Sequence, residues 1–129
     1  MAIIQEEFQH DPWKMLIGCI MLNQTSNRNV RQVIYTFFDR WPTPQDVVKA
    51  NPDEIREHIR PLGFYNRRTV TIQKFSEEYI NKKFTEAHEL YGIGKYANDS
   101  YEIFINGNRN VEPTDVILRA YLNGEFIDQ

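Results

Sequence analysis

The chain has 129 residues, of which 41% are hydrophobic, 26% charged and 13% aromatic. These values are typical of a globular protein with one packed core, and they argue against two domains, intrinsic disorder and collagen-like repeats. The 15 Lys and Arg residues are outnumbered by 18 Asp and Glu residues, so the formal net charge is -3. A chain of this charge has no overall positive field, and a nucleic acid would have to bind at a local basic surface.

The longest apolar stretch, about residues 15–22, is far shorter than the roughly 20 residues that cross a bilayer, and no signal-peptide pattern opens the chain. We therefore expect a soluble, intracellular protein. A single cysteine, Cys19, excludes an internal disulfide, a four-cysteine zinc site and an iron–sulfur cluster held by four thiolates of this chain. Because Cys19 lies in the apolar stretch, we expect it in the core.

Three helix starts are predicted from pairs in which a capping residue precedes proline: Asp11-Pro12, Thr43-Pro44 and Asn51-Pro52. Proline suits the first helical position because its missing N–H has no partner there in any case. Apolar residues recur at helical spacing over residues 12–22 and again over residues 30–41. Both segments are therefore expected to form core helices.

The rest of the chain is also predicted to be helical. The expected helices span residues 52–60, 66–81, 86–90 and 95–105, with a last one from Thr114 or Asp115 to the stop at Gly124. In the helix over residues 66–81, Val70, Phe75 and Tyr79 are expected to face the interior. No segment shows the sustained alternation of a strand, so the predicted fold class is all-α.

The first candidate site is Leu90-Tyr91-Gly92-Ile93-Gly94-Lys95, where two glycines join two predicted helices. Glycine lets a backbone approach a ligand closely, and the helix that follows directs free N–H groups at it, an arrangement that suits phosphate. Lys95 would add a positive charge. The same pattern is also typical of an ordinary turn between helices with a glycine cap.

A second candidate is Asp115, which stands at the start of the last predicted helix. The helix dipole and free N–H groups favour an ionised carboxylate there, and such a group can stabilise a developing cation or orient a water molecule. Aspartate is equally common as a plain helix cap.

Two further segments combine polar or basic residues with a turn. Residues 60–68 place Phe64 and Tyr65 between basic residues that include Arg67 and Arg68, as expected of a surface that grips a nucleic-acid backbone and unstacks a base. The alternative is a solvated helix face with both aromatic rings in the core. The polar loop over residues 22–26 has an equally simple alternative, a helix end with a serine cap.

In order and spacing, these features resemble the helix-hairpin-helix (HhH-GPD) superfamily of DNA glycosylases. Within it, the chain is most similar to the glycosylase domain of the methyl-CpG-binding thymine DNA glycosylase, over about residues 3–121. The motifs that carry the likeness are Gln5-Glu6, His10-Asp11-Pro12-Trp13-Lys14, Leu22-Asn23, Thr25-Ser26, Pro61-Leu62-Gly63, Lys74-Phe75-Ser76, Gly92-Ile93-Gly94-Lys95-Tyr96 and Asn98-Asp99-Ser100-Tyr101.

The resemblance implies one all-helical domain over residues 1–129, built as two small lobes with the active site in the cleft between them. The helix-hairpin-helix would span about residues 85–105, and a minimal C-terminal lobe would begin at about residue 114. The implied reaction is hydrolysis of an N-glycosidic bond after base flipping. Asp115 falls on the catalytic aspartate of the family, so its loss should abolish turnover and leave DNA binding largely intact.

The resemblance also bears on what happens after base removal. Family members that cut the abasic site carry a lysine where this chain has Tyr96, and that lysine forms a Schiff base with the sugar. Lys95 lies one residue earlier, about 100° around the helix, and is expected to face a phosphate. The resemblance therefore implies a monofunctional glycosylase. A bifunctional lyase that uses Lys95 and a non-catalytic DNA-binding module are the alternatives.

The remaining site residues are also assigned by the resemblance. Gln5 would read the edge of a pyrimidine and Tyr96 would line the base pocket, while Phe64 would wedge into the duplex and Gln24 would fill the gap left by the flipped base. The other expected DNA contacts are Arg67, Arg68, Gly92, Gly94 and Lys95. In the methyl-CpG-binding thymine DNA glycosylase that the chain resembles, arginine stands at the position of Gln24, and this departure bears on recognition of the opposite guanine.

The implied substrate is double-stranded DNA with thymine or uracil opposite guanine, bound by a monomer. Adenine glycosylases carry a catalytic glutamate at the position of Cys19, which disfavours adenine removal. The implied chemistry uses no cofactor and no iron–sulfur cluster, although backbone carbonyls of the hairpin often hold a monovalent cation in this superfamily. The expected location is intracellular and associated with DNA.

Overall fold

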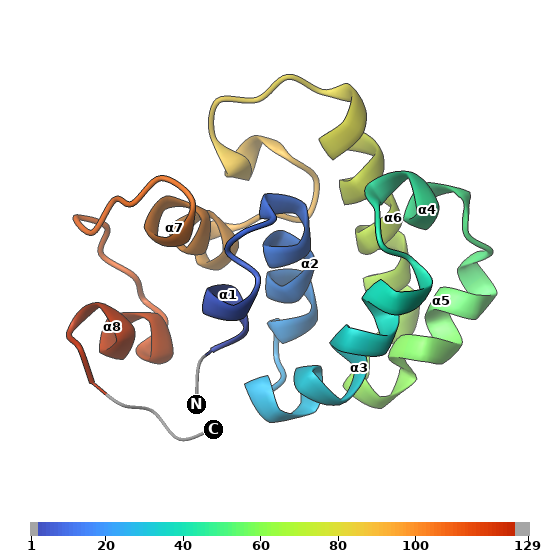
Figure 1. The fold of residues 1–129 in the computed structure, drawn as a ribbon, viewed down its shortest axis with the longest axis horizontal. Helices are drawn as coiled ribbons and strands as arrows, with labels where there is room; N and C mark the ends of the chain where they lie inside the picture. Colours follow the sequence, from blue (N-terminus) through green and yellow to red (C-terminus); the bar gives the residue numbers. More distant parts are fainter. Residues whose placement is uncertain (1–2, 126–129) are drawn as a thin grey trace.

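The computed structural model describes residues 3–125, and every regular element in that range is a helix (Figure 1). The predicted all-α fold class is confirmed. The elements in chain order, with η marking a 3-10 helix, are α1 (Ile4–Glu7), α2 (Pro12–Leu22), α3 (Asn27–Arg40), α4 (Pro44–Lys49), α5 (Pro52–Ile59), η1 (Arg60–Leu62), α6 (Tyr65–Asn81), η2 (Ala87–Glu89), α7 (Lys95–Phe104) and α8 (Val116–Leu122). Within the described residues, no helix is both long and apolar enough to cross a lipid bilayer.

The three predicted helix starts are confirmed by their caps. The side chains of Asp11, Thr43 and Asn51 accept first-turn backbone N–H groups at 3.2, 3.2 and 2.9 Å, respectively. A proline follows each of them in the first turn of α2, α4 or α5. Each cap satisfies an N–H group that the helix itself leaves without a partner, so these local pairs define where the helices begin.

Helix α2 is the centre of the molecule. Nine of its 11 residues are buried, and it packs against α1, α3, α6 and α7. Figure 1 shows α2 running through the middle, with α1, α7 and α8 on one side and α3 to α6 on the other. The two groups of helices form the two expected lobes, and the loop that follows α2 lies between them.

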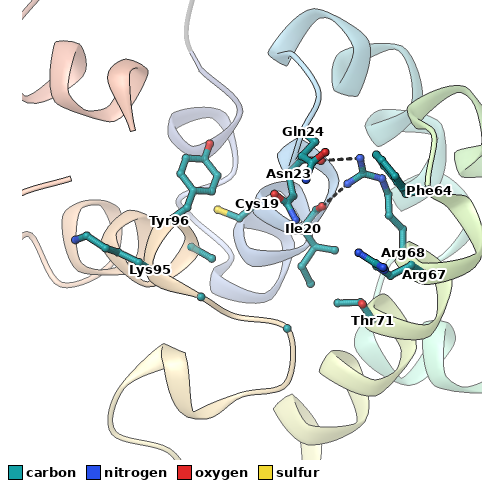
Figure 2. A pocket seen from close by; sticks show the side chains of 13 residues that line it. Cys19, Ile20, Asn23, Gln24, Phe64, Arg67, Arg68, Thr71, Lys95 and Tyr96 are labelled. Carbon is teal, nitrogen blue, oxygen red and sulfur yellow. Dashed lines mark hydrogen bonds between the residues drawn. The ribbon is translucent and has the colours of Figure 1, made fainter. Parts of the chain in front are cut away.

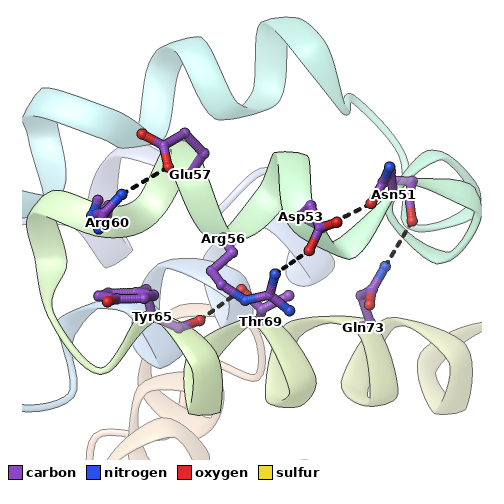
Figure 3. A network of polar contacts seen from close by, with 9 residues as sticks. Asn51, Asp53, Arg56, Glu57, Arg60, Tyr65, Thr69 and Gln73 are labelled. Carbon is purple, nitrogen blue, oxygen red and sulfur yellow. Dashed lines mark hydrogen bonds and ion pairs between the residues drawn. The ribbon is translucent and has the colours of Figure 1, made fainter.

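The second lobe is tied together by polar contacts as well as by its core. The side-chain amide of Gln73 on α6 donates to the carbonyls of Val47 and Ala50, at 3.2 and 3.0 Å, where α4 ends (Figure 3). The hydroxyl of Thr69 donates to the carbonyl of Tyr65 at 2.7 Å within the first turns of α6. The bonds of Gln73 anchor α6 to the end of α4, and the first turn of α6 carries residues of the site.

Two details of the sequence prediction are wrong. The segment over residues 86–90 is not an α-helix but forms only η2, whose start is capped by the carboxylate of Glu89, which accepts the N–H of Glu86 at 2.8 Å. Val70 is 47% exposed rather than interior. Helix α6 buries the stripe that contains Ile72 and Phe75, and Val70 lies about 200° from Ile72 around the helix.

Helix α1 was not predicted, and close packing holds it in place. A Cβ atom at Gly18 would lie 2.7 Å from Cγ2 of Ile4, so glycine in α2 lets α1 approach. The N–H of Ile4 donates to Oδ1 of Asn27 at 2.9 Å, and the hydroxyl of Tyr121 on α8 donates to Glu6 at 2.9 Å. These contacts set the position of the buried residue between them, Gln5.

Candidate active site

A cavity of about 350 Å³ opens between the glycine hairpin and the turn that precedes α6 (Figure 2). A second cavity of about 270 Å³ adjoins it and reaches the start of α8. The two cavities share Asn23, Gln24 and Tyr96, so they form one cleft. The site residues expected from the sequence that line it are Gln24, Phe64, Arg67, Arg68, Gly92, Gly94, Lys95, Tyr96 and Asp115.

Asp115 caps α8 and is half-buried at one end of this cleft. Its carboxylate accepts the N–H of Leu118 at 2.9 Å, which fixes one oxygen and orients the group. The preceding loop is held by the guanidinium of Arg119, which donates to the carbonyls of Pro113 and Thr114 at 3.2 to 3.3 Å. The carboxylate is thereby held in place at the start of α8, where it lines the second cavity.

Lys95 lies at the first turn of α7, and its ammonium group bonds protein groups. It pairs with Asp99 at 2.9 Å and donates to the carbonyl of Glu112 at 3.2 Å. Figure 2 shows its side chain extending away from Cys19. The ammonium therefore supports the loop before Asp115, and it would have to leave Asp99 to reach a phosphate.

Gln5 lies behind Tyr96, where α1 meets α7. The amide nitrogen of Gln5 donates to the hydroxyl of Tyr96 at 2.6 Å and to Oγ of Ser100 at 3.2 Å. The amide oxygen of Gln5 is buried and has no hydrogen-bond partner among the described residues. Burial raises the pKa of Tyr96, so its phenol stays neutral. Sequence reasoning missed Ser100, although its spacing of four residues from Tyr96 places both on one face of α7.

Cys19 is buried, as predicted, and it also lines the larger cavity. Burial raises the pKa of its thiol from 9.0 to about 12. We expect native Cys19 to resist iodoacetamide at pH 8, since the thiolate is the reactive form, and to react once urea unfolds the chain. Mass spectrometry measures the labelling. Fast labelling of the native protein would contradict this environment.

Raising the pH from 9 towards 12 is expected to lower the free energy of unfolding. Below pH 9 the thiol of Cys19 is protonated in both states, whereas above it the unfolded thiol ionises and the buried one keeps its proton until about pH 12. The contribution of this thiol to stability is therefore present at neutral pH and lost within that window.

Gln24 and Phe64 both adopt left-handed backbone. Their φ angles are 62° and 46°, and no other non-glycine residue of the described range has a positive φ. Phe64 is 59% exposed, which rules out the alternative that its ring lies in the core. Strained residues of this kind concentrate at functional sites, where the surrounding structure holds them. Both side chains stand at the rim of the cleft (Figure 2).

Arg67 and Arg68 are neighbours with opposite surroundings. Arg67 is exposed and lines the cleft, as expected of a DNA contact. Arg68 is only 4% exposed, and its guanidinium donates to four backbone carbonyls. The guanidinium donors of Arg68 are therefore used inside the protein, and its role in DNA binding stays a prediction.

The two glycines of the hairpin differ in what requires them. Gly92 has a φ of 77°, and a Cβ atom there would lie 2.4 Å from Cγ2 of Thr71. Gly94 caps α7 without a positive φ, and a Cβ atom there would meet no atom within 4 Å. The fold thus requires glycine at position 92. At position 94 nothing in the described structure requires glycine. A ligand that closely approaches the backbone there would require it.

Residues 17–123 match the family described as HhH-GPD superfamily base excision DNA repair protein. The chain belongs to this superfamily. The resemblance noted in the sequence is thereby confirmed, and the cleft described above is the cleft of an HhH-GPD domain.

Relatives of this HhH-GPD chain include the methyl-CpG-binding domain protein 4-like protein of Arabidopsis thaliana, which is 40% identical over 92% of the chain and 27% of the relative. The thymine-DNA glycosylase of Aeropyrum pernix is 33% identical over 67% of the chain and 42% of the relative. The chain thus spans less than half the length of these two relatives.

Solved structures share the fold. A thermostable thymine-DNA glycosylase superposes with a TM-score of 0.74 at 23% identity, over 84% of this chain and 53% of that one. A trapped covalent intermediate of endonuclease III with DNA gives the same TM-score of 0.74 at 22% identity, over 84% of this chain and 55% of that one.

Proposed function

We propose that this HhH-GPD chain is a monofunctional DNA glycosylase that removes thymine or uracil opposite guanine. The observation that carries the proposal is the buried amide of Gln5, which bonds Tyr96 directly behind the cleft that Tyr96 and Asp115 line. Relatives named thymine-DNA glycosylase and thymine/uracil-DNA glycosylase support the choice of substrate.

The amide of Gln5 supports a pyrimidine that carries a ring N–H. Both N–H groups of Gln5 are used by Tyr96 and Ser100, so the edge that remains is the oxygen, which accepts. Thymine and uracil offer a donor at N3, whereas cytosine has an acceptor there. A buried acceptor without a partner favours the base that supplies the missing hydrogen. Gln5 thus selects thymine or uracil once the base is flipped.

Asp115 supplies the chemistry of bond cleavage in this proposal. As the bond between the sugar and the base breaks, positive charge develops on the sugar ring and the electron pair leaves with the base. The carboxylate stabilises that charge and orients the water that adds to the sugar carbon. The water gives up its proton, the base takes one up, and the products are the free base and an abasic site.

Lys95 is not the nucleophile in this mechanism, because its ammonium pairs with Asp99 and Tyr96 takes the position of the lyase lysine. We expect no covalent adduct when borohydride is added to protein and substrate DNA. The Lys95→Met variant is expected to keep base release within about tenfold of wild type, since the ammonium group is on the exposed side of its pair with Asp99 and takes no part in bond cleavage. A borohydride-trapped adduct that disappears in Lys95→Met would establish the bifunctional alternative.

The proposed reaction needs no redox group or divalent metal. Within residues 3–125, no group of three or more His, Cys, Asp or Glu residues is placed to hold a metal ion. A monovalent cation at the hairpin carbonyls remains a prediction, as does action as a monomer on double-stranded DNA. Arg67 and the free N–H groups at the start of α7 are the groups we propose for phosphate contacts.

The proposal is tested with labelled duplexes that contain G·T, G·U, A·U or G·C, each sample being split between hot alkali and no treatment. Cleavage of G·T and G·U only after alkali is the expected result. Strand breaks without alkali would indicate the bifunctional alternative. Binding without cleavage of any duplex would contradict the proposal and favour a DNA-binding module.

A further inference from the structure

Arg68 ties together two segments that are far apart in the chain. Its guanidinium donates to the carbonyls of Ile20 and Asn23, at 2.9 and 2.6 Å, where α2 ends. It also donates to the carbonyls of Gly63 and Leu62, at 2.9 and 3.4 Å, in the turn before α6. Figure 2 shows the guanidinium between the loop after α2 and the start of α6. One buried side chain therefore sets the relative position of both segments.

The two segments are those that carry the strained residues of the rim. Gln24 directly follows the carbonyl of Asn23, and Phe64 directly follows that of Gly63. A left-handed backbone is unfavourable for residues with a side chain, and it persists only where neighbouring contacts hold it. Arg68 bonds both of the preceding carbonyls, and its guanidinium lies 5.8 Å from the ring of Phe64.

The hydrogen-bond partners of Arg68 indicate that it holds backbone segments in place rather than forming an ion pair. Every acceptor of Arg68 in the described structure is a backbone carbonyl, and none is a carboxylate. The planar fork of arginine can bond several carbonyls in fixed directions, whereas the three rotating N–H groups of lysine cannot reach all of them. The contacts are thus specific to arginine at this position.

We propose that Arg68 is a positioning residue that holds Gln24 and Phe64 in register, so that both side chains enter the duplex together when a base is expelled. This inference rests on the proposed glycosylase function. Arg68 itself touches neither base nor sugar and acts through the two rim residues. Arg68 is therefore expected to raise the rate of base release when the base must be expelled from a base pair. It should have no effect on a base that is unpaired.

The test measures single-turnover base release by Arg68→Lys on three duplexes, with uracil opposite adenine, opposite guanine and opposite an abasic-site analogue. The cost of flipping the base falls in that order. We expect the variant to release the most firmly paired uracil on which wild type acts about 10- to 100-fold more slowly than wild type does. The loss should shrink to less than about threefold on the unpaired uracil. An equal loss on all substrates would overturn the proposal.

A matched control and a second variant keep the test decisive. Arg40→Lys makes the same change on an exposed arginine of α3, paired with Glu54 at 2.8 Å, and should leave base release unchanged. If Arg68→Lys does not fold, Gly63→Ala replaces it. The added Cβ has open space, but alanine disfavours the φ of 77° at this position, so the carbonyl that Arg68 bonds is expected to shift. The same dependence on pairing is expected. No release by wild type from any duplex would instead refute the glycosylase function, and this inference with it.

Discussion

Replacing Asp115 with asparagine is expected to lower the rate of base release by about 1000-fold, because the variant loses the negative charge that stabilises the developing cation. Asparagine caps a helix as well as aspartate does, so the bond to the N–H of Leu118 can be kept. The melting temperature and DNA affinity should therefore change little. Single-turnover kinetics, thermal unfolding and binding to a G·U duplex measure the three quantities.

The same substitution at a distant helix cap is the control. Asp11 also caps a helix through its side chain, at the opposite end of α2 from the cleft. Asp11→Asn should release base at the wild-type rate. An Asp115→Asn protein that folds, binds DNA and turns over at a rate close to wild type would exclude Asp115 as the catalytic carboxylate.

Replacing Gly92 with alanine is expected to destabilise the fold by about 2 to 4 kcal/mol, from steric overlap and left-handed strain together. The added Cβ would lie 2.4 Å from Cγ2 of Thr71 on a backbone with a φ of 77°. The double variant Gly92→Ala with Thr71→Ala should regain the stability lost to steric overlap, because the threonine methyl group is gone. The stability lost to the left-handed backbone should not return. Urea unfolding monitored by circular dichroism measures both.

Gly94→Ala tests whether glycine at this position is needed for DNA binding rather than for folding. Its Cβ has open space, so stability should change by less than about 1 kcal/mol. DNA binding should weaken by about tenfold if a phosphate approaches this backbone. Unchanged affinity in Gly94→Ala would place the phosphate elsewhere, and an unchanged melting curve in Gly92→Ala would contradict the strained turn.

Local signals in the sequence predicted most of the helices. The pairs that begin at Asp11, Thr43 and Asn51 act within one helical turn, so neighbouring residues are sufficient to specify them. Helix α1 has only four residues and is far too short to form alone. It depends on the space at Gly18 and on the contact with Asn27, and no local pattern reports either.

The burial of Arg68 and the exposure of Val70 have one origin. Residues two positions apart lie about 200° from each other around a helix, so both side chains cannot face the same core. Val70 was expected inside and Arg68 at the DNA-binding surface, whereas the structure buries Arg68 and exposes Val70. Hydrophobicity alone favours valine in the interior. The four carbonyls that make the arginine acceptable there come from segments that only the tertiary fold brings together.

The environment of Lys95 could have been predicted more fully. Asp99 follows it by four residues in α7, a spacing at which oppositely charged side chains meet on a helix. The contact with the carbonyl of Glu112 depends on the loop before α8 and has no signature in the sequence. The same limit applies to Gln5, whose partners on α7 lie more than ninety residues away.

The free base released from G·T and G·U duplexes tests the central claim most directly, counted by mass spectrometry beside the number of alkali-labile sites in the same sample. The account predicts thymine or uracil in a one-to-one ratio with abasic sites, intact strands before alkali, and no comparable release by Asp115→Asn. Absence of free base, or strand breaks that appear without alkali, would contradict it.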